Sequence, residues 1–304
     1  MLDLGIVIVN WNTRDLLRKC LKTVYASMGN FSYMVVVVDN ASTDDSAAMV
    51  ESEFPRARLI ASPENVGYPK GNNLGLRALG YLGAGDIAAD APRYALLLNP
   101  DTEVPPDALQ QMVAFMDAHP EVGAAGPMLV LPDGSLDKAC RRGFPSPQVS
   151  AYHYMGLAKL FPKSPQFGRY NMTYLDPEVE TEVDSVVGAY MQVRREAIAQ
   201  VGLLDEAFFM YGEDLDWAYR IKTAGWKIMY HPQVRVKHVK RAASKQSPRA
   251  QAEFWKAMLI FYRKHYQSTT PWWLHNLVMA GLLLKGGRGM WQMLRQPVQP
   301  VASS

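Results

Sequence analysis

The sequence is poor in cysteine and in net charge, and each deficit removes a class of function. Only Cys20 and Cys140 occur among the 304 residues, so neither a disulfide framework nor a CxxC zinc site is available. This cysteine usage fits a reducing, cytoplasmic compartment. The formal net charge is only +3, and a charge this small does not favour nucleic acid as a partner.

Long apolar runs are also missing. A membrane-spanning helix needs roughly 18 consecutive apolar residues, and the closest stretch, Pro271–Leu284, is shorter than that. The segment Met1–Asn10 has neither a basic region nor a small-residue cleavage site, so we do not expect a signal peptide. Hydrophobic residues make up 48% of the chain and charged residues 20%, which is the composition of a folded globular protein.

The first half of the chain alternates between short apolar runs and amphipathic segments. The apolar runs predict buried strands over Gly5–Val9, Met34–Val38, Arg58–Ala61, Tyr94–Leu98 and Val122–Ala125. Helices are predicted between them, with caps near Thr13 and at Ser42 and Thr43. We further expect a turn and then a helix within Gly67–Leu79, and a helix from Pro106. This alternation indicates an α/β fold with a doubly wound, mostly parallel sheet.

The second half is less regular. Asp133 and Gly134 lie between two apolar runs and predict a hairpin turn. Residues 144–182 are rich in proline and tyrosine and give no clear assignment. Beyond them we expect strands over Asp184–Val193, Lys227–Tyr230 and Val234–His238, and helices over Glu213–Ala224 and Arg249–Tyr266.

Polar side chains gather where the predicted strands end, at Asn10, Asn12, Asp39, Asn99 and Asp101. Wound sheets bind ligands beyond the carboxyl ends of their strands, so these residues predict one site built from several strand ends. Asp101 is suited to holding a divalent cation against a diphosphate, because hard cations prefer oxygen ligands. The alternative is an ordinary turn, since Asn, Pro and Asp all favour turns.

Three further features are candidates for the same site. The stretch Glu213–Asp216 holds three acids that could include a general base, although a helix dipole also favours acids in the first turn. His238 ends a predicted strand and is either a metal ligand, or an ordinary histidine that lies at the surface or has its hydrogen bonds satisfied within the protein. The loop that holds Asn65 and Gly67 permits close backbone approach to a ligand, or simply precedes a helix.

The order of these features resembles the family-2 glycosyltransferases of the GT-A fold, and most of all their bacterial rhamnosyltransferase-like members. The segments that carry the resemblance span residues 4–245 and include IVIVNWNTRDLLRKCLKTV, VVVVDNASTDDS, PENVGYPKGNNLGLR, LLLNPDTEV, VVGAYMQVRREAIAQVGLLDEAFFMYGEDLDWAYRIKTAGWKI and VRVKHVKRAAS. The resemblance implies an inverting, metal-dependent transfer from a nucleotide sugar to a saccharide or lipid-linked acceptor in surface polysaccharide synthesis. It favours dTDP-rhamnose as donor over a UDP-sugar, and Mg²⁺ or Mn²⁺ as cofactor.

The resemblance also implies a role for each matching residue on the nucleotide side. Asp39 would hydrogen-bond the nucleobase. The residues that would line the base and ribose are Asn10, Asn12, Asn65 and Gly67.

On the transfer side, Asn99 and Asp101 occupy the positions of the family's DxD motif. Asp101 and His238 would bind the metal, and Asp214 would be the catalytic base. Gly188 and Ala189 would lie near the donor sugar, where side chains must be small. Asn99 departs from the usual Asp and contributes no charge, which predicts a lower metal affinity.

The predicted domain organisation follows the extent of the resemblance. Residues 1–245 would form the catalytic domain, with a nucleotide-binding half and an acceptor-binding half, and residues 246–304 a helical C-terminal extension. Residues 271–295 mix Trp and Leu with cations, a pattern typical of a helix in a membrane interface. We therefore expect peripheral attachment to the inner face of the cell membrane, or else packing on the chain itself or on a second subunit of a homodimer.

Two other functions compete with glycosyl transfer. A sugar-nucleotide pyrophosphorylase would need a Gly-rich, basic phosphate loop after the first strand, and the sequence there is Asn10-Trp11-Asn12-Thr13. A non-catalytic module that binds nucleotide sugars would not need Asp39, Asp101, Asp214 and His238 together.

Overall fold

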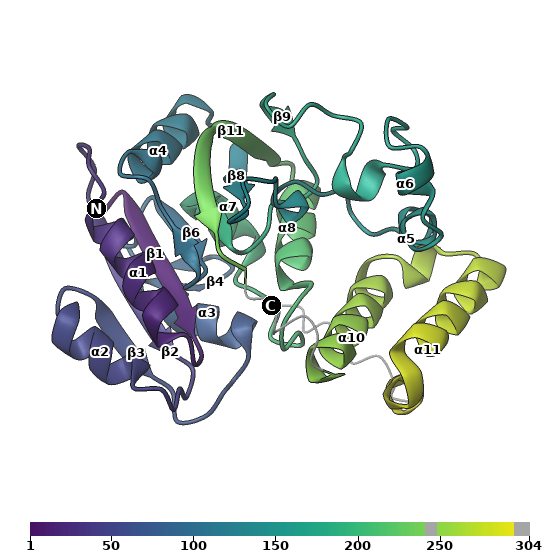
Figure 1. Ribbon diagram of the computed structural model, residues 1–304, viewed down its shortest axis with the longest axis horizontal. Helices are drawn as coiled ribbons and strands as arrows, with labels where there is room; N and C mark the ends of the chain where they lie inside the picture. Colours follow the sequence, from purple (N-terminus) through teal and green to yellow (C-terminus); the bar gives the residue numbers. More distant parts are fainter. Residues whose placement is uncertain (241–247, 295–304) are drawn as a thin grey trace.

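The computed structural model describes residues 1–240 and 248–294, and in that part of the chain a mixed sheet forms the centre. The strand order is β3-β2-β1-β6-β10-β8-β11-β7, with β9 paired to β11 (Figure 1). The strands are β1 (Leu4–Asn10), β2 (Tyr33–Asp39), β3 (Arg58–Ala61), β6 (Tyr94–Leu98), β7 (Thr102–Glu103), β8 (Val122–Val130), β9 (Thr181–Glu182), β10 (Tyr190–Arg194) and β11 (Lys227–His238). A separate pair joins β4 (Tyr81–Gly83) to β5 (Asp86–Ile87).

The first half of the sheet is parallel, as predicted. β1 pairs in parallel with both β2 and β6, and β2 with β3. The strand β10 is inserted antiparallel between β6 and β8, and β8 then pairs in parallel with β11. The apolar runs of β1, β2 and β6 are buried on both faces, which is why they contain no alternation of polar and apolar residues. The prediction of a wound, mostly parallel α/β sheet is confirmed.

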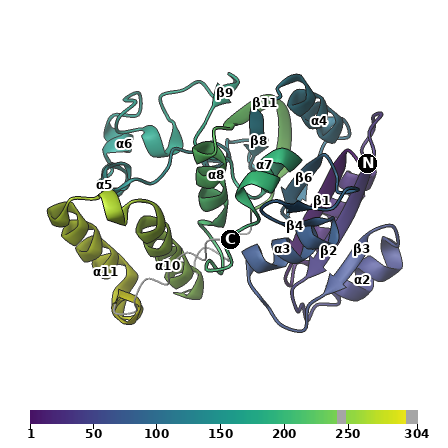
Figure 2. The ribbon, with the colours of Figure 1, turned by 180° about the vertical axis from the view of Figure 1, so that it is seen from behind.

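Helices cover both faces of the sheet. α1 (Arg14–Tyr25) and α4 (Ala108–Ala118) lie on the face seen in Figure 1, and α3 (Tyr68–Ala78) and α7 (Arg195–Val201) on the face seen in Figure 2. The remaining helices are α2 (Ser46–Glu53), α5 (Pro147–Tyr154), α6 (Leu157–Leu160), α8 (Glu213–Thr223), α10 (Pro248–His265) and α11 (Trp272–Leu294), with short 3₁₀ turns at Lys138–Cys140, Arg169–Asn171 and Gln267–Thr269.

Several local predictions are wrong. Ser42 and Thr43 do not cap α2, which begins at Ser46 and whose first N–H donates to the Asp44 carboxylate at 3.2 Å. The predicted strand from Asp184 begins only at Tyr190, because Asp184 and Ser185 donate their backbone N–H groups to the Arg142 carbonyl and Gly188 donates its own to Asp214.

The two predicted strands after residue 226 are one strand, β11, with a shift in register between His231 and Arg235. Residues 144–182, which gave no assignment, contain the short helices α5 and α6. The predicted turn at Gly134 is confirmed, since Val130 and Leu136 bridge across it in antiparallel fashion.

The two C-terminal helices form a hairpin beside α8. α10 packs its Ala257 and Phe261 against Leu215 of α8 and Phe208 in the preceding loop. α11 packs against α10 through a second cluster formed by Leu259, Leu282 and Met290. Among residues 1–240 and 248–294, no helix is both long enough and apolar enough to cross a membrane.

Candidate active site

The carboxyl ends of β1 and β2 form one hydrogen-bonded cluster. Asn10 ends β1, and its Nδ2 donates to Asp39 Oδ1 over 3.0 Å and to Ser42 Oγ over 3.1 Å. The other Asp39 oxygen accepts from the Ser42 backbone N–H at 3.0 Å. Asn10 and Asp39 are both buried. The structure therefore brings these two predicted residues together and adds Ser42, which the sequence suggested only as a helix cap.

Asn12 closes this cluster from the side of α1. Its backbone N–H donates to Ser42 Oγ at 2.9 Å, and its side-chain Oδ1 accepts from the Thr43 N–H at 2.7 Å. The residue has a φ of 53°, in the left-handed region that asparagine adopts more readily than most residues. Thr13 likewise bonds back to Asn10 Oδ1, at 2.6 Å, and does not cap α1 through its side chain.

The loop that holds Asn65 and Gly67 is organised by Asn40, a residue the sequence analysis did not single out. Asn40 Nδ2 donates to Asn65 Oδ1 over 3.0 Å and to the Gly67 carbonyl over 3.2 Å, and its Oδ1 accepts from the Val66 N–H at 2.9 Å. All the polar atoms of one buried amide are thus used to shape the loop. Asn40 directly follows Asp39, which is the only signal in the sequence that could have found it.

Gly67 lies against the aromatic loop that precedes α8. Its φ is +86°, and a Cβ built on it would lie 2.5 Å from the carbonyl oxygen of Phe209. The same oxygen accepts the backbone N–H of Tyr68 at 2.8 Å. Only glycine fits at this position, because any side chain would separate the two loops.

Tyr68 connects two further parts of the predicted site. Its hydroxyl lies 3.0 Å from Asn99 Oδ1 and 2.9 Å from the carbonyl oxygen of Gly188, both of which are acceptors. Burial raises the pKa of the Tyr68 phenol well above its usual range, so the group remains a donor. Tyr68 was not predicted to belong to the site, and its place at the start of a helix gives no signal of this role.

Gly188 and Ala189 enter the site mainly through their backbone. The Ala189 carbonyl accepts the Asn99 N–H at 3.0 Å, while the Ala189 side chain is buried in the hydrophobic core. A Cβ on Gly188 would lie 3.4 Å from the Tyr68 hydroxyl, an ordinary contact distance. The packing of the chain itself therefore does not require glycine at 188.

Asp101 and His238 meet at the ends of β6 and β11. His238 Nε2 lies 3.3 Å from Asp101 Oδ1, and His238 Nδ1 lies 2.9 Å from Asp137 Oδ2. Lys240 Nζ lies 2.8 Å from Asp137 Oδ1. Burial opposes the charged imidazolium, but the hydrogen bonds with Asp101 and Asp137 outweigh it and raise the pKa of His238 to about 8. His238 is therefore a buried residue of the site, not a surface histidine.

Asp137 was not predicted, although it decides how His238 points. Burial alone would raise the pKa of Asp137, but hydrogen bonds from His238 and Lys240 outweigh it and hold that pKa below its usual range. An ionised Asp137 favours a proton on His238 Nδ1 and leaves Nε2 directed at Asp101. Carboxylates behind metal-binding histidines act in this way.

The donor atoms of Asp101 and His238 fit a shared cation. Two ligands at right angles on an octahedral ion, each about 2.1 Å from it, lie about 3 Å apart, close to the 3.3 Å between these atoms. Within the described part of the chain no third His, Cys, Asp or Glu joins them. A divalent cation held here would take its remaining ligands from water and a diphosphate.

Asp214 lies in the first turn of α8 and is held by three N–H donors. Its Oδ2 accepts from Arg142 Nη2 at 2.7 Å and from the Gly188 N–H at 3.0 Å, and its Oδ1 from the Leu215 N–H at 2.7 Å. The pair with Arg142 is almost fully buried, with side-chain exposures of 10% and 7%. Arg142 was not predicted, because it lies between the Gly134 turn and the unassigned residues 144–182, where no pattern marks it as pointing inward.

The two acids beside Asp214 have different environments. Glu213 is buried, one of its carboxylate oxygens has no hydrogen-bond partner, and burial together with the adjacent Asp214 raises its pKa. Asp216 is fully buried in an ion cluster, with Lys264 Nζ at 2.8 Å and His265 Nε2 at 2.7 Å. Asp216 thus links α10 to α8, and its contacts give it a structural role.

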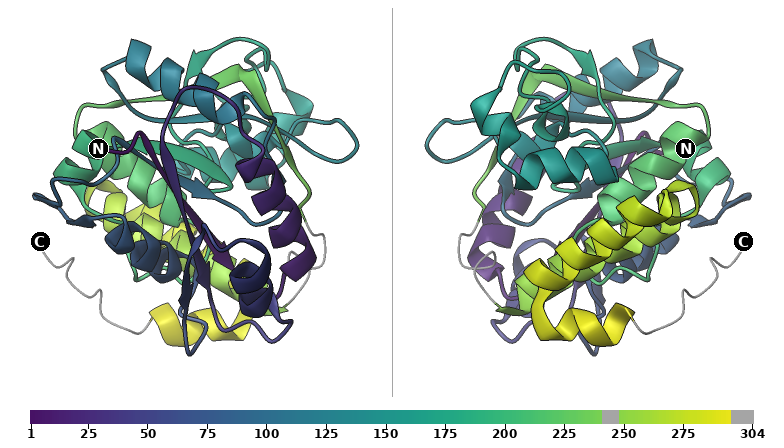
Figure 3. Two further views of the ribbon diagram at one scale, coloured as in Figure 1. Left: turned by 90° about the vertical axis from the view of Figure 1, so that its left-hand side faces the viewer. Right: turned by 90° about the vertical axis from the view of Figure 1, so that its right-hand side faces the viewer.

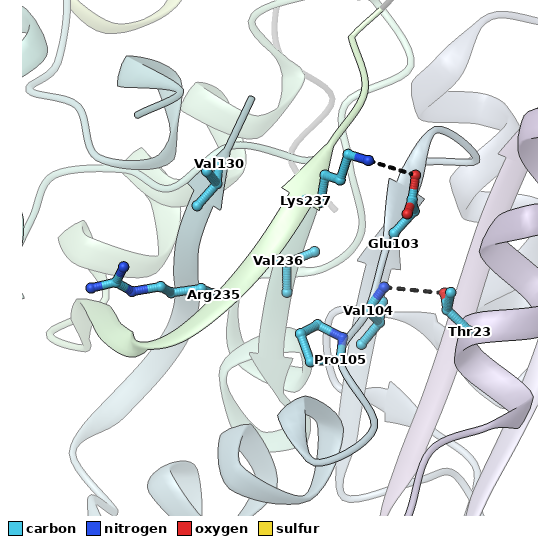
Figure 4. A pocket seen from close by; sticks show the side chains of 8 residues that line it. All are labelled: Thr23, Glu103, Val104, Pro105, Val130, Arg235, Val236 and Lys237. Carbon is cyan, nitrogen blue, oxygen red and sulfur yellow. Dashed lines mark hydrogen bonds and ion pairs between the residues drawn. The ribbon is translucent and has the colours of Figure 1, made fainter. Parts of the chain in front are cut away.

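A surface groove of about 370 Å³ lies beside the site but does not belong to it (Figure 4). Glu103 and Lys237 line it and pair at 3.3 Å. Side chains alternate along a strand, so Lys237 points to the opposite face of β11 from His238.

A family model for glycosyltransferase-like family 2 matches residues 3–252. The chain belongs to this family. A relative, the N-acetylglucosaminyl-diphospho-decaprenol L-rhamnosyltransferase of Mycobacterium tuberculosis, is 31% identical over 241 residues, which cover 79% of this chain and 76% of the relative. The rhamnosyltransferase WbbL of Escherichia coli K12 is 27% identical, over 77% of this chain and 82% of the relative.

The fold of this glycosyltransferase is also found in solved structures. A crystal structure of GalNAc-T7 with UDP, GalNAc and Mn²⁺ matches with a TM-score of 0.57 and 16% identity, over 89% of this chain. This chain spans about half of that one, 52% of its length. The resemblance to the rhamnosyltransferase-like branch and the GT-A fold are confirmed, and the chain is a glycosyltransferase of the kind that takes nucleotide-sugar donors.

Proposed function

We propose that this glycosyltransferase moves rhamnose from dTDP-rhamnose to a hydroxyl of a lipid-linked saccharide during surface polysaccharide synthesis, with inversion at the anomeric carbon. UDP-sugars are the alternative donors. The choice of sugar is supported by the two relatives named as rhamnosyltransferases. The choice of acceptor is supported by the name of the mycobacterial relative, which specifies a saccharide on a decaprenol diphosphate.

The observation that carries the proposal is a continuous chain of contacts from the acid on α8 to the end of β6. Asp214 accepts from Gly188, whose carbonyl meets the Tyr68 hydroxyl, which in turn meets Asn99. Asp101 follows two residues later. A carboxylate for the acceptor and a carboxylate for the diphosphate are thereby held at one edge of the sheet.

We assign Asp214 as the general base. The acceptor hydroxyl gives its proton to Asp214 as its oxygen forms a bond to the anomeric carbon. The bond from that carbon to the diphosphate oxygen breaks, and its electron pair leaves with the nucleoside diphosphate. The donors Arg142, Gly188 and Leu215 fix the direction of the Asp214 side chain before the reaction. One displacement with one base inverts the configuration.

Asp101 and His238 would hold Mg²⁺ or Mn²⁺, which when bound supplies positive charge at the diphosphate. Asp137 orients His238 for this task. On the nucleotide side, Asp39 would contact the base, while Asn10, Asn12, Asn65 and Gly67 shape the surface for base and ribose. Asn99 and the backbone of Gly188 and Ala189 would border the donor sugar.

We further propose that residues 1–245 form the catalytic domain and residues 246–304 its extension. The family match ends nearby, at residue 252.

The test is a panel of nucleotide sugars incubated with the purified chain and Mn²⁺ or Mg²⁺. The expected result is slow release of the nucleoside diphosphate, fastest with dTDP-rhamnose and abolished by a chelator. Binding without any release would favour a non-catalytic module, and nucleoside triphosphate formation on addition of pyrophosphate would favour a pyrophosphorylase. Release without metal would remove the metal from the proposal.

A further inference from the structure

Acidic residues are absent from two long segments of the chain. Residues 138–175 and 254–304 contain none of the 29 acids but 12 of the 32 lysine and arginine residues. These two segments, which we call the acid-free end, therefore carry a formal charge of +12, and the rest of the chain carries −9. The small total of +3 hides this separation.

The described parts of the two segments, which end at residue 294, lie together in space. α5 and α6 of the first segment and α10 and α11 of the second occupy the same end of the molecule (Figures 1 and 3). They touch through Tyr154 of α5 and Trp255 of α10, whose ring centroids are 5.3 Å apart. The charge separation in the sequence is thus also a separation in space.

The same end exposes large apolar side chains. Of the 15 exposed large hydrophobic residues in the described part of the chain, nine belong to the acid-free end. They include Leu160, the last residue of α6, which is 70% exposed, and the following Phe161, which is 53% exposed. On α11 they include Trp272, Leu277 and Leu284. Lys159 and Lys163 flank the α6 pair and are exposed as well.

Both segments form ion pairs with the first turn of α8. Arg142 of the first segment binds Asp214 over 2.7 Å. Lys264 and His265 of the second segment bind Asp216 over 2.8 and 2.7 Å. Because of these ion pairs, any partner that binds the acid-free end is held at a fixed distance from Asp214, the candidate base.

We propose that the acid-free end, with α6 as well as α11 in contact, docks on an anionic lipid surface and so presents lipid-linked acceptors to Asp214. Trp, Phe and Leu mixed with cations are the side chains that insert at such a surface, and anionic lipids attract the charge. A second copy of the chain would bring like charges together at the exposed Lys159, Lys163 and Lys285, and this repulsion disfavours a homodimer through the same face. The inference rests on the proposed function for the identity of the acceptor.

The experiment is sedimentation of the full chain with vesicles of phosphatidylglycerol and phosphatidylethanolamine, against vesicles of phosphatidylcholine. The variant K159Q/K163Q removes charge from α6, and L160S/F161S removes its apolar contact. Each lysine near an anionic surface contributes about 1 kcal/mol, so we expect roughly thirtyfold weaker binding for the first variant. We expect about tenfold weaker binding for the second, from partial insertion of two apolar side chains. Met28→Ser, which changes an equally exposed residue outside the acid-free end, should bind like the unchanged chain.

Soluble donor hydrolysis by the same preparations reports whether each variant is folded and whether the proposed function holds. Hydrolysis without binding to anionic vesicles would overturn the docking proposal alone. Equal vesicle binding by the unchanged chain and both α6 variants would also overturn it. So would a dimer in sedimentation velocity that the α6 variants dissociate, because the face would then belong to a second copy.

Discussion

Replacing Asp214 by Asn separates the chemical role of this residue from its structural role. Both carboxylate oxygens accept N–H groups, from Arg142 and Gly188 on one side and from Leu215 on the other. An Asn side chain has one oxygen and one NH₂, so its NH₂ must face a donor on one of the two sides. The negative charge opposite the buried Arg142 is lost at the same time.

The magnitude follows from these contacts. Removing one partner of a buried ion pair costs about 3–5 kcal/mol, and Asn retains part of the hydrogen bonding, so we expect a loss near 3 kcal/mol in the free energy of unfolding. Loss of a general base lowers the rate by roughly 10²–10⁴-fold. Donor affinity should be unchanged, because we assign the diphosphate and nucleotide contacts to other residues.

The assays are urea unfolding, donor binding by calorimetry, and transfer or hydrolysis rates per folded molecule. Asp216→Asn is the matched control, since it makes the same change two residues away in the same helix. Asp216 is buried against Lys264 and His265, so its variant should lose stability but keep its rate per folded molecule. Asp214 is not the base if the Asp214→Asn variant keeps more than about a tenth of the rate of the unchanged chain, or if the rate per folded molecule falls by the same factor in both variants.

Three other changes test the rest of the site. Asp101→Ala should abolish metal-dependent turnover, while the free energy of unfolding changes by no more than about 0.5 kcal/mol because the residue is partly exposed. Full activity of this variant would show that Asp101 does not hold the metal. A metal ion binds the neutral form of His238, whose pKa is raised to about 8, so the half-saturating Mn²⁺ concentration should rise about tenfold for each pH unit below 8. His238 is not a ligand if that concentration does not depend on pH, or if it equals the concentration found for His238→Ala. Gly67→Ala should weaken donor binding and destabilise the chain by at least about 1 kcal/mol, since its Cβ would meet the Phe209 carbonyl. An unchanged donor affinity, measured by calorimetry, together with an unchanged free energy of unfolding would mean that the two loops move apart freely.

The sequence by itself determined the wound sheet and several of the polar residues at its carboxyl edge. Strands buried on both faces must be continuously apolar, so β1, β2 and β6 were visible as runs of Val, Ile and Leu. The polar residue at the end of such a run must lie at the carboxyl edge of the sheet. Asn10, Asp39 and Asp101 could therefore be placed before any contact was known.

Only the tertiary structure decided how the site is held in place. The partners of the catalytic candidates, Asp137 for His238 and Arg142 for Asp214, lie 101 and 72 positions away in the chain. Both come from the loop and 3₁₀ segment after β8, where no periodic pattern marks a side chain as pointing inward. The separated charges of the acid-free end were present in the sequence, but only the packing of α5 and α6 beside α10 and α11 brought them to one surface. Long-range pairing of this kind depends on which elements become neighbours, and local periodicity carries no information about that.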